Sequence, residues 1–188
     1  SFPTRRSSDL PPVRLEVKLG MNESSRYGDL ADMEWKTGLV GGIGVRFQGG
    51  MRPWLGVELL YSQKGANWSI SVTDSRLRLT YLELPVLFGM PLRVGEATYI
   101  EPKVGLAPAY KVDETLIING SDFSSHYFKD WDLGAVFGAG ARRELGTIGA
   151  SIEVRYTLGL QEIDNPDEME FQGSDRNKSF SVLVGVLF

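Results

Sequence analysis

The residues of this 188-residue chain that could do chemistry are charged side chains at every second position of otherwise apolar segments. Glu153 and Arg155, like Glu101 and Lys103, follow β-strand spacing, which puts alternate side chains on opposite faces. Charges that share a face could form an ion-pair network or a path for protons or ions. The chain has no cysteine and one histidine, His126, which leaves little for nucleophilic or metal chemistry. We therefore assign no catalytic, cofactor-binding or metal-binding residue and expect no enzyme activity.

The bulk composition is that of a soluble protein, with 42% hydrophobic residues and a mean hydropathy of −0.13. No run approaches the ~18 apolar residues of a membrane helix. A transmembrane β-strand, however, needs only ~9–11 residues with every second one apolar. The net charge of −4 provides no basic surface for nucleic acid.

The charged positions belong to segments in which apolar and polar or small residues alternate. The last segment is the most regular: Phe180, Val182, Val184, Val186 and Phe188 share one face. Such a face would be an aggregation hazard at the edge of a soluble sheet, whereas in a closed membrane barrel it would contact lipid. Eight such segments are expected: 13–22, 37–47, 54–64, 77–90, 98–112, 131–143, 148–160 and 179–188.

The connections between these segments alternate in length. Short turns follow the second, fourth and sixth segments, and the turn after the sixth, Glu144-Leu145-Gly146, is very tight. Long polar stretches follow the others, at 23–36, 65–75, 113–130 and 162–177. In an up-and-down barrel with an even strand number, all short turns lie at the end that holds both termini. The sequence therefore predicts an all-β, eight-stranded antiparallel up-and-down transmembrane β-barrel formed by residues 11–188 as one domain.

If the apolar faces contact lipid, the charges occupy an interior only wide enough for side chains, where they must be paired or hydrated. We interpret them as a structural ion-pair network; a proton or ion path is the functional alternative. The expected centre of the network is Glu58, Glu83, Glu101, Arg142, Glu153 and Arg155, and the wider set adds Arg14, Glu16, Lys18, Arg46, Lys64, Lys103 and Glu144.

Two other interpretations of the alternation stay open. A narrow porin-like channel would need a continuous wet path past the interior charges. A soluble, lipocalin-like ligand-binding barrel would reverse the faces, with apolar side chains lining the cavity. Alternation alone does not decide between these, but the loop asymmetry and the terminal phenylalanine favour the membrane.

Three further features have local interpretations. Pro85, Pro102 and Pro108 lie within expected strands, where each removes a hydrogen-bond donor, so bulges are expected in two adjacent strands. The first ten residues, SFPTRRSSDL, resemble a translated sequencing adapter; we expect them to be non-native and a signal peptide to be missing. The last long loop could bind Ca²⁺ or a cationic partner, but it lacks EF-hand spacing and a solvated loop is favoured. Its acids are Glu162, Asp164, Asp167, Glu168, Glu170 and Asp175.

Three segments carry a resemblance to a known family: ELLYSQKG at 58–65, YLELPVLF at 81–88 and VRYTLGL at 154–160. They resemble the PorT-like outer-membrane β-barrel family of Bacteroidetes-type bacteria. The resemblance implies an eight-stranded barrel in the bacterial outer membrane, with lipid as its surroundings. The alternating C-terminal segment is similar to the signal read by the outer-membrane insertion machinery. The family implies no single activity, so we expect a structural, adhesion or accessory role through the extracellular loops, with an extracellular or envelope protein as a possible partner.

Overall fold

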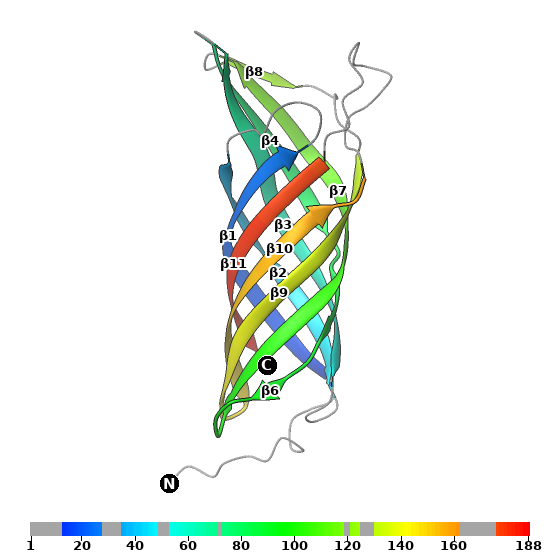
Figure 1. Cartoon of the computed structure of the whole chain (residues 1–188), viewed down its shortest axis with the longest axis vertical. Helices are drawn as coiled ribbons and strands as arrows, with labels where there is room; N and C mark the ends of the chain where they lie inside the picture. Colours follow the sequence, from blue (N-terminus) through cyan, green and yellow to red (C-terminus); the bar gives the residue numbers. More distant parts are fainter. Residues whose placement is uncertain are drawn as a thin grey trace.

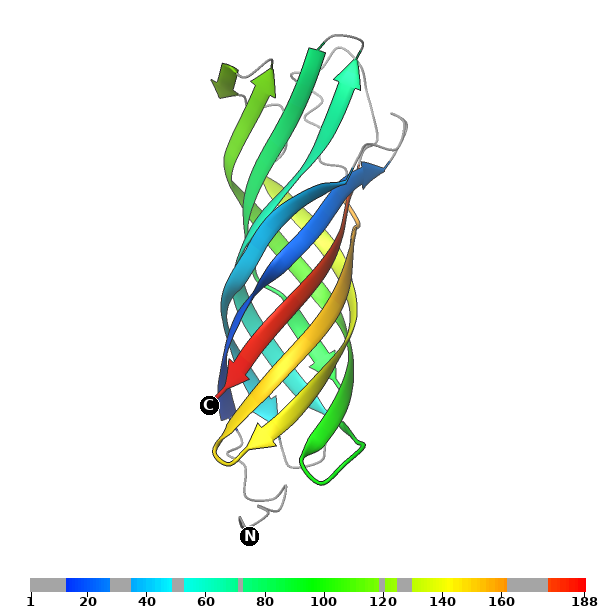
Figure 2. The same ribbon diagram turned by 90° about the vertical axis from the view of Figure 1, so that its left-hand side faces the viewer.

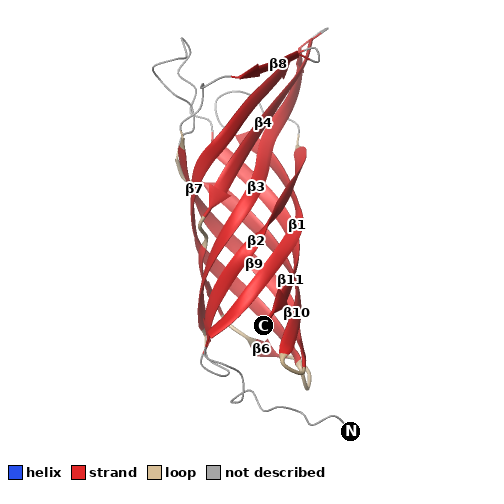
Figure 3. Ribbon diagram, turned by 180° about the vertical axis from the view of Figure 1, so that it is seen from behind, coloured by secondary structure: helices blue, strands red, loops and turns tan. Residues whose placement is uncertain are grey.

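The chain forms a closed wall of tilted strands, seen from three sides in Figures 1, 2 and 3. The computed structural model describes residues 13–27, 35–48, 53–70, 73–118, 121–124, 130–161 and 176–188. The adapter-like segment 1–10, His126 and the six acids of the last long loop lie outside the described residues. The described part contains no helix long and apolar enough to cross a membrane.

The barrel wall consists of eight antiparallel units, called staves here. Seven of the staves are single strands, and the eighth is interrupted and consists of two strands. The strands are β1 (Val13–Tyr27), β2 (Lys36–Gln48), β3 (Trp54–Ile70), β4 (Thr73–Glu83), β5 (Val86–Gly89), β6 (Leu92–Arg93), β7 (Thr98–Ile118), β8 (Ser121–Ser124), β9 (Trp131–Leu145), β10 (Ile148–Gly159) and β11 (Arg176–Leu187). Strands β4 and β5 form one stave between β3 and β7, while β6 and β8 are short additions to β7. The predicted eight-stranded antiparallel barrel is confirmed.

The barrel closes where the first strand pairs with the last. Strand β1 pairs with β11 from Glu16 and Leu187 to Tyr27 and Arg176. Following the paired residues from strand to strand, from Arg14 once round the barrel, leads back to β1 at Ser24. The register is therefore offset by ten residues on closure. With about 3.3 Å per residue and about 4.8 Å between strands, this offset corresponds to a strand tilt of about 40°. A barrel of this size has room inside for side chains only.

The orientation of the two faces is as predicted for a membrane barrel. On the outer wall, Phe180, Val182, Val184 and Val186 of β11 and the adjoining Phe188 are 38–56% exposed. The charged residues of the opposite faces are buried in the lumen. A lipocalin-like arrangement has the reverse orientation, so that alternative is wrong.

The prolines explain why one stave is broken. The amides of Leu84 and Met90 donate to the carbonyls of Pro108 and Pro102, respectively. A strand residue directs its N–H and C=O to the same side, so each of these prolines turns its donorless nitrogen towards the β4–β5 stave. The strand is interrupted at these points, after Glu83 and after Gly89. The expected bulge lies nearby, where the β4–β7 register shifts between Thr80 and Tyr81.

The described N- and C-terminal strands begin and end at the same end of the barrel, here called the short-turn end (Figure 2). The tightest turn, Gly146-Thr147, joins the paired Leu145 and Ile148. A two-residue hairpin loop requires a positive φ, and Gly146 supplies it with +73°. The opposite end is the long-connection end.

At the long-connection end the strands extend further than predicted. The stretches 65–75 and 113–130 were expected to be loops, but β3 continues to Ile70, β4 begins at Thr73, β7 continues to Ile118 and β8 follows. These parts of β3, β4, β7 and β8 project beyond the other strands (Figures 1 and 2) and are called the β-extension here. Apolar alternation did not indicate them because a sheet outside lipid has no face that must be apolar.

The face assignment predicts that the cost of a charge depends on its depth. Val184→Arg places a charge in the middle of the apolar wall and should lower the free energy of unfolding by about 2–4 kcal/mol. Val13→Arg makes the same change on the same face at the short-turn end, where the cost should be about 0–1 kcal/mol. Urea titration of both variants in lipid vesicles measures the difference. Equal losses would contradict the assignment.

Candidate functional site

The lumen is filled at the short-turn end by a continuous set of ion pairs. Its centre is Glu58, which accepts hydrogen bonds from both terminal nitrogens of Arg155 at 2.7 and 2.8 Å and from Lys18 Nζ at 2.6 Å. Lys18 also donates to Glu153 at 3.1 Å, and Glu153 pairs with Lys103 and Arg155 as well. Each of these two carboxylates is therefore shared by cations from several strands.

The same set continues towards the chain termini. Glu101 lies between Arg46 and Arg142, each 2.8 Å from one of its carboxylate oxygens. Glu16 joins the two halves, because it contacts Arg46 at 3.3 Å and Lys18 at 3.2 Å. Arg142 also pairs with Glu144. The connected residues, called the lower network, are Arg14, Glu16, Lys18, Arg46, Glu58, Glu101, Lys103, Arg142, Glu144, Glu153 and Arg155.

Aromatic rings fill the space that the charges leave. The Arg46 guanidinium lies 4.1 Å from the centre of the Trp54 ring, and Lys103 Nζ lies 5.4 Å from it. Trp54 is 2% exposed. Its ring lies against Gly89, where an added Cβ would be 2.3 Å from Trp54 Cζ2. The missing side chain at position 89 makes room for this ring, which covers two cations of the lower network.

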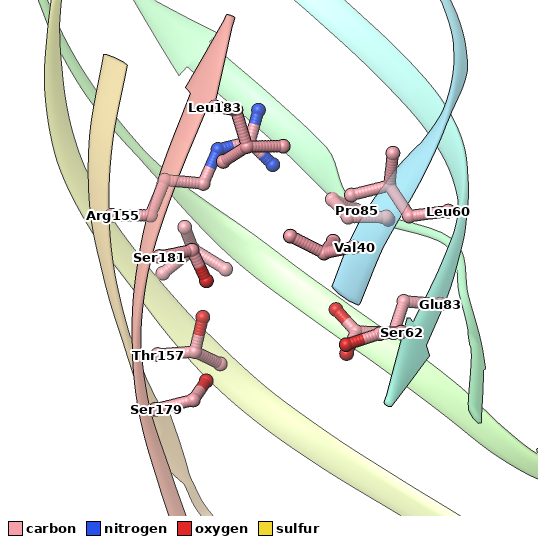
Figure 4. A pocket seen from close by; sticks show the side chains of 11 residues that line it. Val40, Leu60, Ser62, Glu83, Pro85, Arg155, Thr157, Ser179, Ser181 and Leu183 are labelled. Atoms are coloured by element: carbon pink, nitrogen blue, oxygen red, sulfur yellow. The ribbon is translucent and has the colours of Figure 1, made fainter. Parts of the chain in front are cut away.

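A layer without charge pairs lies beyond Arg155, towards the long-connection end. Its apolar members Val40, Leu60 and Leu183 pack together in the lumen. Figure 4 shows side chains from opposite walls pointing towards one another across the cavity at this level. Ser181 and Thr157 also line that cavity, as do Arg155 of the lower network and Glu83. The remaining space is on the order of one water molecule.

A second, smaller group of polar side chains follows at the long-connection end, and we call it the upper group. Lys64 Nζ lies 2.7 Å from a Glu83 carboxylate oxygen, and Asn177 Nδ2 donates to Asp132 Oδ2 at 2.8 Å. These four residues are buried. No ion pair joins the upper group to the lower network among the described residues.

The structure places the residues expected at the centre of the interior charges in two groups. Five of them, Glu58, Glu101, Arg142, Glu153 and Arg155, lie in the lower network. Glu83 does not, because its ion-pair partner is Lys64, although it lines the same cavity as Arg155. The prediction also left out Asp132 and the lumenal Trp54. Asp132 shares a face with the lumenal residues of its strand, and Trp54 is a tryptophan on the non-apolar face of its segment. The alternation could therefore have predicted that both side chains lie in the lumen.

The arrangement offers charge pairing and little else chemically. In the described part of the chain, no group of three or more His, Cys, Asp or Glu side chains is arranged to hold a metal ion. The carboxylates of the lower network are engaged by lysine and arginine. These ion pairs cross-link the interior of the barrel.

Comparison with known proteins identifies the class. A family model for the outer membrane protein β-barrel domain matches residues 6–165. The chain belongs to this family of bacterial outer-membrane barrels. No curated protein matches it.

Solved structures show the same fold at low sequence identity. Neisserial surface protein A is 12% identical with a TM-score of 0.54, over 94% of this chain and 96% of that one. OprG of Pseudomonas aeruginosa is 10% identical with a TM-score of 0.53, over 98% and 99%. The attachment invasion locus protein Ail of Yersinia pestis is 13% identical with a TM-score of 0.50, over 95% and 100%. The likeness concerns the barrel fold.

The contacts of the lower network predict a large loss of stability when the Glu58 carboxylate is removed. Glu58→Ala leaves Lys18 and Arg155 buried with fewer partners, so the free energy of unfolding should fall by about 3–5 kcal/mol. Asp130→Ala is the control: its side chain is 58% exposed and lies 3.6 Å from Lys111, so the loss should be about 0–1 kcal/mol. Urea unfolding in vesicles compares them. A loss below 1 kcal/mol for Glu58→Ala would show that the network does not depend on this residue.

The Trp54 packing predicts a position-specific glycine effect. Gly89→Ala forces the indole to move away from the cations and should cost about 1–3 kcal/mol through overpacking. At Gly95 the same change should be close to neutral, because the nearest atom to an added Cβ, Thr98 Cβ, is 3.6 Å away. Thermal unfolding followed by gel mobility measures both. Similar midpoints for the two variants would contradict the close approach.

Proposed function

We propose that this protein is a non-catalytic outer-membrane barrel with a sealed lumen, whose role is carried by the β-extension. The long-connection end faces outward, as in barrels with short periplasmic turns. The role is structural, adhesive or accessory, through contact with an extracellular or envelope protein. Within its family, the chain is assigned to the PorT-like branch on the segments 58–65, 81–88 and 154–160.

The observation that carries the proposed binding role is the continued pairing of a few strands beyond the rim. Among the described residues, the β7–β9 register ends at Tyr110 and Trp131, with one further hydrogen bond from the Lys111 amide to the Asp130 carbonyl, whereas the pairing of β7 with β4 continues to Ile118. Strands β3 and β4 stay paired to Ile70 and Thr73. Paired strands outside lipid form an ordered platform, and sheet edges of this kind bind extended segments of other proteins.

The sealed lumen is supported by three features in series. The lower network joins charges from opposite walls, the layer of Val40, Leu60 and Leu183 follows it, and the Lys64–Glu83 pair lies beyond. An ion crossing the barrel would have to break several buried pairs, and each broken pair costs several kcal/mol. These features favour a plug over the porin-like channel.

The outer wall supports the proposed partners in the membrane. The apolar face of β11 would contact lipid, and its terminal Phe188 is 56% exposed. We propose that Phe180, Val182, Val184, Val186 and Phe188 also form the segment that the insertion machinery reads.

Two measurements test the proposal. In planar lipid bilayers the refolded protein should give no stepwise conductance; reproducible ohmic steps would favour the channel. Residues 67–76, which lie between the paired Ala66 and Leu77, are replaced by a two-residue turn, and cells displaying this variant are compared with wild-type cells. Adherence to protein-coated surfaces and to other cells should fall to that of cells without the barrel.

The control is a short peptide inserted after Gly146, in the tight turn at the opposite end. It should leave adherence unchanged. A shortened barrel that keeps its heat-modifiable gel mobility and full adherence would rule out the β-extension as the binding element.

A further inference from the structure

The upper group contains a buried carboxylate, Asp132, of which only one oxygen has a hydrogen-bond partner among the described residues. Asp132 is 5% exposed, and its Oδ2 accepts the hydrogen bond from Asn177. Its Oδ1 is buried and has no hydrogen-bond partner among the described residues. Leaving a buried charged acceptor unpaired is costly, so native structures supply a partner to such an atom.

The surroundings of Asp132 form a small cavity of oxygen-bearing and very small residues. Thr157, Ser179 and Asn177 line it together with Asp132. Gly134, Gly159, Ala107 and Ala109 complete the lining with Lys64. The space is on the order of one water molecule. Hydroxyl, amide and carboxylate oxygens are ligands of hard cations.

The charges of the upper group favour a cation. Lys64 lies 2.7 Å from Glu83 and also attracts Asp132 electrostatically, so one ammonium faces two carboxylates. Lys111, the next lumenal lysine, pairs with Glu114 at 2.6 Å and with Asp130 at 3.6 Å. No lysine or arginine nitrogen lies within 4.0 Å of the Asp132 carboxylate among the described residues. The upper group therefore carries one uncompensated negative charge in a confined space.

We propose that this cavity binds a single small monovalent cation of the size of Na⁺, held by Asp132 Oδ1 with oxygens of Thr157 and Ser179. A divalent ion is disfavoured because sites for Ca²⁺ or Mg²⁺ use more oxygen ligands or several retained waters, and the described chain brings no three acidic side chains together. The site lies near the long-connection end of the lumen, level with the exposed Trp131 that precedes Asp132, so ions reach it from that end.

The test is the dependence of thermal stability on the cation at constant ionic strength. The refolded barrel is heated in NaCl or in N-methylglucamine chloride, and the loss of the compact gel band is followed. A ligand that binds only the folded state stabilises it. When the Na⁺ concentration is ten times its dissociation constant, the thermal unfolding midpoint of the wild type should be about 3–6 °C higher in NaCl than in N-methylglucamine chloride.

Variants assign the effect to the cavity. Asp132→Asn removes the charge with little change of shape and should abolish the Na⁺-dependent shift. Asp130→Asn removes a charge two residues away, outside the cavity, and should keep it. Thr157→Val keeps the charge, removes one oxygen and should reduce the shift, which preserves the test if Asp132→Asn does not refold. No shift in the wild type, or an equal shift in Asp132→Asn, would overturn the proposal and leave water as the partner of Oδ1.

Discussion

The structure depends on one constraint, the pairing of every backbone amide within a wall surrounded by hydrocarbon. An unpaired amide there costs several kcal/mol, so the sheet must close. Closure is made by β1 and β11, the strands furthest apart in the sequence. The prolines fit this constraint because Pro102 and Pro108 direct their donorless nitrogens to the points where the β4–β5 stave is interrupted. These departures from regular pairing thus lie where the β4–β5 stave pairs with β7.

Closure also determines what fills the interior. With eight strands and a register offset of ten residues on closure, the lumen is narrow enough for side chains to span. Arg155 and Glu58, 97 residues apart in sequence, therefore meet across it. Buried charges are tolerated only with well-placed partners. Here Glu58 and Glu153, the two carboxylates that Lys18 bridges, each pair with more than one cation. The interior is consequently as dependent on register as the wall is, since a shift of one residue would send its charges into lipid.

The alternation of residue types, together with the alternating lengths of the connections and the terminal phenylalanine, was enough to predict the eight staves, their faces and the end at which the short turns lie. Alternation describes one strand at a time, which is why it failed at two places. It did not group Glu83 with Lys64 apart from Glu58, because lumenal neighbours depend on the offset between strands. It also treated 65–75 as a loop, because strands outside lipid need no apolar face. The register, which determines which lumenal charges meet, cannot be deduced from any single segment.

The apolar layer of Val40, Leu60 and Leu183 marks the level at which the lower network meets the upper group, because Arg155 and Glu83 line the same cavity. The lower network has one more cation than anions, and the upper group has one more anion than cations. Arg14, at the short-turn end of the lower network, and Asp132, in the upper group, lie on opposite sides of this layer. No ion pair joins the lower network to the upper group among the described residues. Each excess is therefore better compensated from its own opening of the barrel, by the solution on that side of the membrane.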